Sequence, residues 1–485
     1  MIRRRTITSY VWNSVSGNKM VILSNCIRNF FRKFELLGNC TQGENPAPDN
    51  PQEIKSAGRK SKNLFNIADL RVGQVQKDGT INEKSTHYRT AILDVPEDAK
   101  YRITFKTNTD YNMIYFADAY INGVYSNPYV RVYGGNSNSL ISLKNGKNIL
   151  SFRATKDDAT IGFPKDHNIM IAEESETLDY EPYGYLLDVK VTGKNLLNLQ
   201  KEPDVKGTYQ GWKVGDGKKT IVLSIKDKGN NVDITKCSIG VSGNGINPND
   251  GLGWIVQDGT ILRSEIKTTN PYVTIYPPNE TTVQKFLGRF EIQVEYGTTA
   301  TPYEPYTEQF AKIALDEPLR GIGEYKDVLT KDGVVRKIHE QTLKKEQISM
   351  NEYNWDTKYF RLYVNPDKKI DSSINIHELF SNMFKKFVIY KGNPNVYWVI
   401  SEEEIRSMGI TETDSLQVAY EKIKDFVTTN DIVIQYPIVE TTLEPLPESV
   451  PAQLQALHTE NGTTHVFVDS GEVEAGINIE YKYKS

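Results

Sequence analysis

The chain of 485 residues has little cysteine, with only Cys26, Cys40 and Cys237. None of the three belongs to a Cys-x-x-Cys pair, so they cannot form the disulfide framework of a small secreted domain or a cysteine-based zinc cluster. Histidine is also scarce, and none of the six stands at a ligand spacing such as His-Glu-x-x-His. We therefore predict no bound zinc and expect synthesis in a reducing cytoplasm.

Long apolar runs and an excess of positive charge are missing as well. No stretch approaches the roughly 18 to 20 apolar residues that a membrane-spanning helix needs. Residues 1–33 are basic and hold a short apolar run at 20–23, without the continuous apolar region and cleavage site of a secretory signal. The formal net charge of −4 provides no basic field for nucleic acid. The expectation is no membrane insertion and no nucleic-acid partner.

The chain is rich in tyrosine and glycine, with 28 Tyr against 17 Phe, and 34 Gly. This composition suits half-exposed strands joined by tight turns. Residues 101–106 alternate Tyr, Ile and Phe with Arg, Thr and Lys, as in a strand that has one buried and one solvent-exposed face. Similar short segments separated by turn signals continue to about residue 295. The sequence thus predicts a mainly β chain.

A pair of short sequence motifs, which we call the opening and closing phrases, occurs twice in the chain. Lys-Asn-Leu opens two stretches at residues 62–64 and 194–196, and Tyr-Glu-Pro-Tyr closes them at residues 180–183 and 303–306. The duplicated unit has roughly 120 to 130 residues, about the size of one sandwich domain. Because proline removes a ladder donor, we expect the closing phrase to end a strand and to begin a linker. The predicted organisation is a series of separate domains connected by linkers, like beads on a string.

The other segments complete a predicted domain order. Residues 414–428 have apolar side chains at helical spacing behind Asp414, a plausible cap, which indicates a small α+β module. The end of the chain reads as two strands that are too few to stand alone, so they must pack on the preceding module or on neighbouring subunits. The predicted parts are a basic N-terminal arm (1–33), a Pro-rich lead (34–60), two β-sandwich modules (61–187 and 188–310), a hairpin connector (311–345), the α+β module (346–443) and an extended C-terminal β tail (444–485).

Five features follow one another along the chain, namely the Gly-Asn and Pro-rich lead at 38–51, the Lys-Asn-Leu openings, the Gly-Thr-Thr-Ala-Thr-Pro-Tyr-Glu-Pro-Tyr closing at 297–306, the Pro-Leu-Arg-Gly-Ile-Gly connector at 318–323 and the ending at 433–447. In this order they resemble minor structural and tail proteins of phages that infect Gram-positive bacteria. The resemblance covers roughly residues 34–485. The first closing, at 175–183, departs from the pattern because it lacks the Gly-Thr-x-Ala part. The basic arm does not resemble a tail-attachment domain.

The resemblance implies tandem jelly-roll modules similar to carbohydrate-binding modules. It implies a noncatalytic tail or baseplate protein of the virion, at the tail tip, made in the cytoplasm of the bacterial host. The expected partners are other tail or baseplate proteins, host cell-wall polysaccharide and further copies of the chain in a homo-oligomer, for which we expect a trimer. A tail-associated glycan hydrolase or depolymerase and a pure assembly scaffold are the alternatives.

Sugar recognition needs an aromatic face for the apolar side of the ring and planar polar groups for its hydroxyls. The second repeat offers this mixture, although core packing is the alternative for each tryptophan. The predicted glycan-binding residues are Tyr209, Trp212, Asp250, Trp254, Gln257, Tyr272 and Tyr276.

Two further chemistries stay open at the level of sequence. A hydrolase would use a carboxylate pair such as Asp227 and Asp233, but sequence spacing does not set the separation on which that mechanism depends. Residues 247–251 gather oxygen ligands near a turn as Ca²⁺ sites do, without the later bidentate Glu. We predict no catalytic residue, no metal and no cofactor, with Ca²⁺ as the open alternative.

Overall fold

The computed structural model describes most of the chain. The residues that it describes are 2–8, 12–13, 18–66, 69–84, 88–106, 113–126, 130–133, 137–154, 168–174, 180–207, 209–214, 220–229, 238–242, 246, 254–255, 261–265, 272–276, 280–356, 358–373, 376–447 and 449–484.

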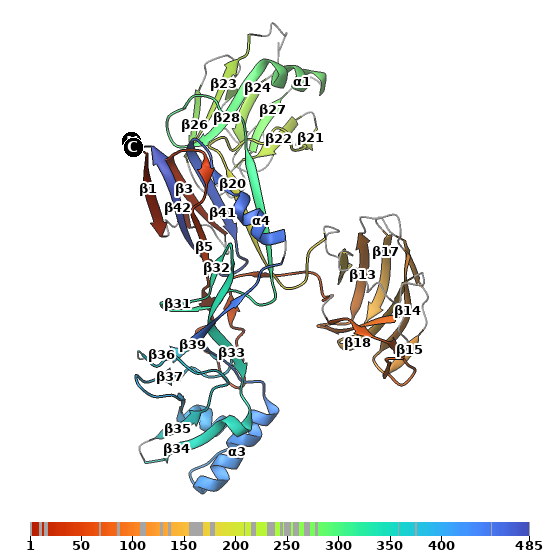
Figure 1. The fold of residues 1–485 in the computed structure, drawn as a ribbon, viewed down its shortest axis with the longest axis vertical. Coiled ribbons are helices and arrows are strands. Elements are labelled where there is room, and N and C mark those ends of the chain that lie inside the picture. The colour runs from red at the N-terminus through yellow and green to blue at the C-terminus, as the bar shows by residue number, and fades with distance from the viewer. Residues whose placement is uncertain are drawn as a thin grey trace. The chain divides into compact units, whose positions relative to one another are not determined.

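The described residues are mainly strands, with four α-helices among them, so the predicted β class is confirmed (Figure 1). The chain divides into two compact units. One contains residues 59–186 and 314–318, and the other contains residues 1–58, 187–313 and 319–485.

A twelve-stranded sheet forms the centre of the unit that contains residues 1–58, 187–313 and 319–485. This sheet joins segments from both ends of the chain. Its main path runs through β29 (Glu308–Leu315), β20 (Tyr185–Thr192), β41 (Gly462–Asp469), β3 (Asn18–Cys26), β42 (Gly476–Lys484), β5 (Lys33–Leu37), β32 (Val328–Thr330), β33 (Gly333–Thr342) and β39 (Val433–Glu444). Three more strands pair beside this path, namely β1 (Ile2–Thr8) with β42, β2 (Trp12–Asn13) with β3, and β8 (Arg59–Lys60) with the first residues of β20.

The prediction that residues 1–33 form a separate basic arm is wrong for the described residues of this segment. β1 pairs with β42 along its whole length, and β3 pairs with β41, so strands drawn in red and blue lie side by side in Figure 1. The short apolar run provides the reason, because Met20, Val21 and Leu23 are buried. These side chains remove apolar surface from water only when strands from the other end of the chain cover them.

The prediction of beads on a string is also wrong. The first repeat lies in the chain between β5 and β20, and the second lies between β20 and β29. All three strands belong to the central sheet. The predicted lead, connector and tail contribute β5, β32, β33, β41 and β42 to that same sheet. Each repeat is therefore an insertion between strands of one sheet.

The two repeats have the same strand order, as expected of a duplicated unit. In each, a larger antiparallel sheet and a three-stranded sheet share one hydrophobic core, which is the arrangement of a β-sandwich. The first repeat has β9 (Arg71–Val72), β12 (Tyr88–Val95), β18 (Gly146–Ala154), β14 (Met113–Ile121), β15 (Val124–Ser126) and β16 (Val130–Tyr133) in one sheet, and β17 (Ser137–Leu143), β13 (Ala99–Lys106) and β19 (Asn168–Glu173) in the other. The second repeat has β21 (Asp204–Lys206), β22 (Tyr209–Lys213), β27 (Tyr272–Tyr276), β24 (Ser238–Ser242) and β25 (Trp254–Ile255), then β26 (Ile261–Glu265), β23 (Thr220–Asp227) and β28 (Phe290–Tyr296), with α1 (Glu280–Arg289) before β28.

The duplicated phrase closes each repeat through one buried asparagine. Asn63 is 2% exposed, and its side-chain Nδ2 donates to the carbonyls of Ile169 and Glu181, at 3.0 Å each. Its Oδ1 accepts from the backbone N–H groups of Phe65 and Ile171, at 2.9 and 3.0 Å. One amide thus ties the opening phrase to the last strand and to the closing phrase.

Asn195 repeats this arrangement in the second repeat. Its Nδ2 donates to the carbonyls of Ile292 and Glu304, at 3.3 and 3.0 Å, and its Oδ1 accepts from the N–H groups of Leu197 and Val294, at 3.1 Å each. We call the four hydrogen bonds of either residue the asparagine clamp. The repeated phrase is therefore a structural device that fastens the ends of each sandwich.

A buried carboxylate organises the connector. Asp327 is fully buried and accepts hydrogen bonds from the Arg336 guanidinium and from the backbone N–H groups of Arg320, Lys337 and Ile338. These bonds connect Asp327, which directly precedes β32, to β33 at the place where the pairing of β33 with β39 changes register. The connector is thus part of the core of the central sheet.

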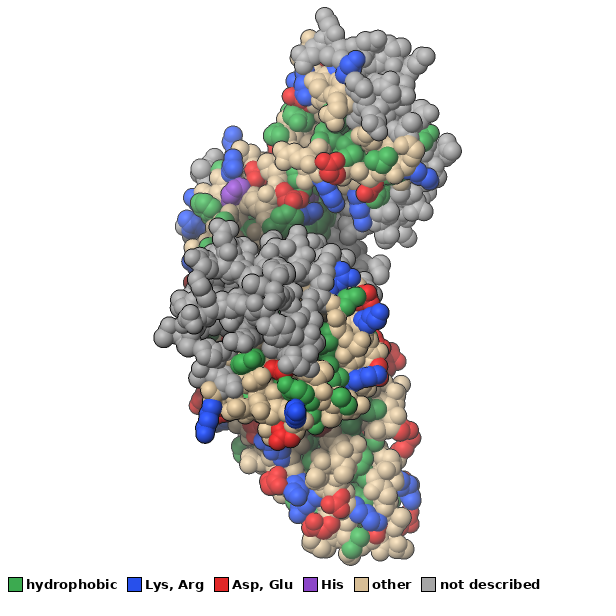
Figure 2. Space-filling model, turned by 90° about the vertical axis from the view of Figure 1, so that its right-hand side faces the viewer, with side chains coloured by type: hydrophobic (Ala, Val, Ile, Leu, Met, Phe, Trp, Pro, Cys, Tyr) green, Lys and Arg blue, Asp and Glu red, His purple; other side chains and the backbone are tan. Residues whose placement is uncertain are grey.

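The α+β module packs a five-stranded sheet against one long helix. The sheet contains β34 (Ile348–Asn354), β35 (Tyr359–Val364), β38 (Val396–Ile400), β37 (Phe387–Ile389) and β36 (Ile376–Leu379), and the helices are α2 (Glu402–Ser407) and α3 (Leu416–Thr429). The predicted helix is confirmed, but its cap is Ser415, whose hydroxyl accepts from Val418 N. Asp414 instead pairs with Lys422 at 2.8 Å. Acidic and basic side chains are interspersed on the face of this module shown in the lower part of Figure 2.

The remaining elements are short. They are β4 (Asn29–Phe30) paired with β40 (His458–Thr459), β6 (Cys40–Thr41) with β7 (Lys55–Ser56), β10 (Gln74–Val75) with β11 (Ile81–Asn82), β30 (Gly321–Ile322) with β31 (Tyr325–Lys326), the 3₁₀ turn η2 (Lys345–Gln347) and α4 (Ser449–Ala456).

Candidate ligand-binding site

The first repeat carries a hairpin that the second repeat does not have. Between β9 and β12 the chain forms β10 and β11, whereas in the second repeat β21 ends at Lys206 and β22 already begins at Tyr209. The turn of the hairpin is set by Asp78, which accepts from the N–H and hydroxyl of Thr80, and by Gly79 at φ +81°. A Cβ at Gly79 would lie 2.7 Å from the Tyr120 ring, so glycine is needed there for space as well.

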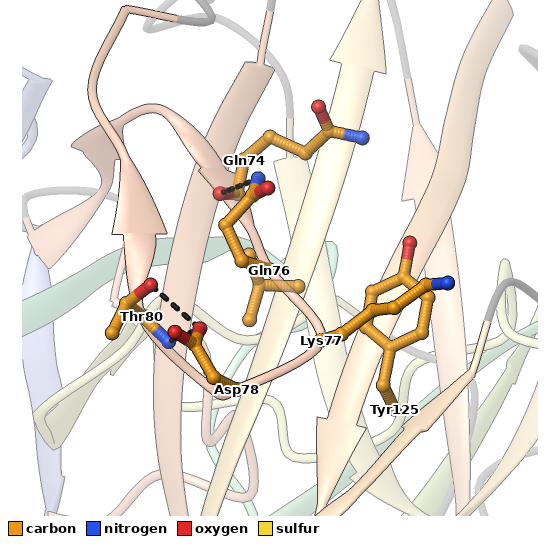
Figure 3. A pocket seen from close by; sticks show the side chains of 7 residues that line it. Gln74, Gln76, Lys77, Asp78, Thr80 and Tyr125 are labelled. Atoms are coloured by element: carbon orange, nitrogen blue, oxygen red, sulfur yellow. Dashed lines mark hydrogen bonds between the residues drawn. The ribbon is translucent and has the colours of Figure 1, made fainter.

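This hairpin forms one wall of a pocket of about 460 Å³. Figure 3 shows Gln74 and Gln76 on one side of the pocket, and Lys77 with the Tyr125 ring, from β15, on another. The lining residues are Gln74, Val75, Gln76, Lys77, Asp78, Thr80 and Tyr125. We call this the hairpin pocket. Its volume lies in the range of about 300 to 1,000 Å³ that is usual for small-ligand sites.

A buried carboxylate fixes two of the lining side chains. Asp118 is 1% exposed, and its two oxygens accept from Gln74 Nε2 at 2.7 Å and from the Tyr125 hydroxyl at 2.6 Å. Asp118 follows a register shift in β14, the kind of irregularity that redirects a side chain out of a regular strand. These two hydrogen bonds hold an amide and a phenol ring in place beside the pocket.

Polar contacts also dock the hairpin on the sheet. The Ser151 hydroxyl accepts from Val75 N at 2.8 Å and lies 2.7 Å from the Thr90 hydroxyl, which donates to the Gly73 carbonyl. Thr90, Ser151 and Asp118 stand opposite one another on three neighbouring strands, as a polar row. The hydroxyls of Ser151 and Thr90 thus fasten the hairpin to the outer face of the sheet.

The pocket offers hydrogen-bonding groups of both kinds beside an aromatic ring. The Gln76 amide donates to the Gln74 carbonyl at 3.0 Å, and Lys77 supplies an ammonium group. The hydrogen bonds from Thr80 lower the pKa of Asp78, so this carboxylate is an acceptor at neutral pH. A general acid requires a raised pKa, so Asp78 is not prepared for acid catalysis. The arrangement suits binding of a ligand with many hydroxyl groups.

Of the seven residues predicted in the second repeat, the structure describes the side chains of Tyr209, Trp212 and Tyr272. Trp212 is 4% exposed within the hydrophobic core, and its Nε1 donates to the Lys201 carbonyl at 2.9 Å. Its ring is therefore not presented to a sugar. Trp254 and Tyr276 lie in β25 and β27, with side chains outside the described part of the structure. Asp250 and Gln257 lie outside the described residues altogether.

Tyr209 and Tyr272 lie on paired strands of the second repeat, on the face opposite to Trp212. Side chains of β22 alternate, so Tyr209 and Lys213 share one face and Trp212 points to the other. Lys213 stands opposite Tyr272, whose hydroxyl donates to Asp204 Oδ2 at 2.6 Å. This hydrogen bond is the main cause of the raised pKa of Tyr272.

The polar row of the first repeat has a reduced counterpart in the second repeat. On β22, β27 and β24, the strands that correspond in order to β12, β18 and β14, Gly211, Thr274 and Gly240 stand opposite one another. The scaffold is duplicated, and the pocket belongs to the first repeat.

The other chemistries considered from the sequence find little support among the described residues. A backbone N–H from Gly229 and the Arg289 guanidinium, 2.8 Å away, lower the pKa of Asp227, while Asp233 lies outside the described residues. The predicted Ca²⁺ turn at 247–251 is also outside them. Within the described part of the chain, no group of three or more His, Cys, Asp or Glu side chains could hold a metal ion. No described helix is long and apolar enough to cross a membrane.

The residues of the hairpin pocket were missed from the sequence. The Asp78-Gly79 pair is a recognised hairpin signal, and it could have located the turn. Nothing in the sequence indicated that Asp118 would meet Gln74 and Tyr125.

Comparisons of this chain with protein-family models, with curated proteins and with solved structures found no match.

Proposed function

We propose that this chain is a noncatalytic structural protein that binds saccharide through the hairpin pocket. The observation that carries the proposal is the buried Asp118, which holds the Gln74 amide and the Tyr125 phenol in fixed positions at the pocket. A saccharide ring presents a C–H face that packs on an aromatic ring, and hydroxyl groups that pair with amides, carboxylates and ammonium groups. The pocket provides all of these within one small volume.

The wider proposal is a tail or baseplate protein of a phage of Gram-positive bacteria. It is supported by the resemblance of the lead, openings, closings and connector to such proteins. In this proposal the two sandwiches are jelly rolls similar to carbohydrate-binding modules, and the pairing of a larger with a three-stranded antiparallel sheet in each repeat agrees with it. The partners are other tail proteins, further copies of the chain in a trimer, and host cell-wall polysaccharide.

The test is binding of the purified full chain to isolated cell walls of Gram-positive bacteria. Soluble wall-glycan fragments serve as competitors, and their length is measured afterwards. We expect saturable binding that the fragments compete away while they stay intact. Shortened fragments would favour the hydrolase alternative, and absence of binding to any wall would favour the scaffold.

A matched pair of variants locates the site. Tyr125→Ala removes the ring and the hydroxyl from the hairpin pocket and should weaken wall binding about tenfold or more. Tyr183→Ala, at an exposed tyrosine of the same unit outside the pocket, should leave binding unchanged. Equal effects of the two substitutions would contradict the assignment of the pocket.

A further inference from the structure

We propose that the chain has a second saccharide site, in a cleft between the central sheet and the second repeat, and that it takes an uncharged oligosaccharide. The inference rests on the proposed function, which it extends to another surface. The cleft has a volume of about 590 Å³, and all its lining residues belong to one compact unit. We call it the sheet cleft. It is lined by Asp188, Lys190, Thr192, Leu196, Asn198, Lys201, Lys213, Tyr306, Glu308, Phe310, Phe467 and Asp469.

The floor of the cleft is one face of three neighbouring strands of the central sheet. Along β20, Asp188, Lys190 and Thr192 face the cleft, while the alternate residues Leu187 and Val189 are buried. The strands on either side, β29 and β41, add aromatic and acidic side chains. The other side of the cleft is lined by Leu196, Asn198, Lys201 and Lys213, from the start of the second repeat.

A buried hydroxyl in the cleft points to a ligand. Thr192 is 2% exposed, and its Oγ1 has no hydrogen-bond partner within the described structure. A polar group buried without a partner destabilises the folded chain. A hydroxyl group of a bound saccharide would supply the missing partner.

An exposed aromatic ring lies in the same cleft. Phe310 is 58% exposed on β29, and Tyr306 precedes it on the same wall. Phe467 is already covered in part by the Lys190 ammonium group, which lies 5.1 Å from the centre of its ring. Phe310 therefore offers the free aromatic face on which the C–H side of a sugar ring packs.

The charges of the cleft favour an uncharged ligand. Three lysines and three carboxylates line it, so their formal charges cancel. Lys190 lies 3.9 Å from Glu308, which also accepts a hydrogen bond from the Tyr306 hydroxyl, and Asp469 accepts from Gly471 N at 3.0 Å. An anion would face the carboxylates and a cation would face the lysines. Hydroxyl groups, which donate and accept, match both.

A second site would change how the chain binds a polymer. The hairpin pocket and the sheet cleft belong to different compact units of the chain. A polysaccharide long enough to reach both sites would be bound with an avidity above the affinity of either site alone.

The test is isothermal titration calorimetry of the full chain with a fixed panel of oligosaccharides of glucose, galactose, rhamnose and N-acetylglucosamine. Tyr125→Ala serves as the background, because only the sheet cleft is then intact. We expect one panel member or more to bind this variant with one site per chain. Adding Phe310→Ala should weaken that binding about tenfold. Phe30→Ala, at a phenylalanine of similar exposure (60%) in the same unit, should not weaken it.

Thr192→Val gives a second readout that a purely structural threonine would not produce. It should weaken oligosaccharide binding about fivefold, because one hydrogen bond to the ligand is lost. It should also raise the melting temperature of the ligand-free chain, because the unpartnered hydroxyl is removed. A lower melting temperature would overturn the inference, since it would show that the hydroxyl has a structural partner.

The outcomes separate this inference from the proposed function. Binding by the wild type that Tyr125→Ala abolishes leaves the hairpin pocket standing and overturns the sheet cleft. Binding that Tyr125→Ala does not change and Phe310→Ala abolishes overturns the hairpin pocket and supports the cleft. Binding that neither substitution alters, or no binding by the wild type, overturns both.

Discussion

Asn63→Ala removes the asparagine clamp of the first repeat, and its cost follows from the structure. The substitution deletes four hydrogen bonds of 2.9 to 3.0 Å and leaves two backbone carbonyls and two backbone N–H groups without this partner. A hydrogen bond contributes about 1 kcal/mol net, and an unsatisfied buried group costs about 1–3 kcal/mol. Because water can reach some of the freed groups in a relaxed variant, we expect a loss of about 3–5 kcal/mol for this repeat.

A chain of two compact units is not expected to unfold in a single two-state transition, so one global free energy of unfolding would not report on one repeat. Hydrogen exchange measured by mass spectrometry can instead follow the loss of stability in each repeat separately. Asn63→Ala should lower protection across β13 and β19 and leave β23 and β28 unchanged, whereas Asn195→Ala should do the reverse. Asn82→Ala is the matched control, because Asn82 is exposed and its Oδ1 accepts only from Lys84 N among the bonds described. An effect of Asn63→Ala no larger than that of Asn82→Ala would refute the clamp.

Two further predictions concern buried and paired carboxylates. Asp327→Asn should destabilise the central sheet by about 2–4 kcal/mol, because an amide NH2 in place of one carboxylate oxygen leaves two of its four buried donors without an acceptor, while Arg336 keeps its ion pair with Glu444. Urea unfolding of the variant checks this. The pKa of Asp227 is lowered, first by the Gly229 N–H and then by Arg289, from an ordinary value of 3.8. Its stabilising contribution is therefore present above pH 3.8 and lost as the pH falls through the lower folded pKa, so thermal melts of Asp227→Asn between pH 2 and 5 should show a weaker pH dependence than the wild type.

The sequence predicted the local features of the fold well, because those features depend on neighbours in the chain. Residues 101–106 alternate and form part of β13, and residues 414–428 have a helical period and contain most of α3. The repeated phrase located both sandwiches. Long-range pairing has no such local signal. Met20 and Val21 appeared as a short apolar run in a basic segment, and their partners in β41 follow more than 400 residues later.

The site escaped prediction for a related reason. Tryptophans drew attention to the second repeat, where Trp212 proved to be a core residue with its N–H satisfied inside the fold. In the first repeat the decisive contact joins Gln74, Asp118 and Tyr125, which come from a hairpin, a bulged strand and an edge strand. Each of these residue types is common on protein surfaces. Only the folded structure shows that they meet.

The most direct test of the central claim compares two tyrosines that make the same hydrogen bond in different repeats. The hydroxyls of Tyr125 and Tyr272 each donate to an aspartate at 2.6 Å, the first at the hairpin pocket and the second among the residues predicted from the sequence. The measurement is the affinity of Tyr125→Phe and Tyr272→Phe for soluble wall-glycan fragments by calorimetry. Weaker binding by Tyr125→Phe, with Tyr272→Phe equal to the wild type, is the result that we predict. Weaker binding by Tyr272→Phe alone would contradict the account and return the site to the second repeat.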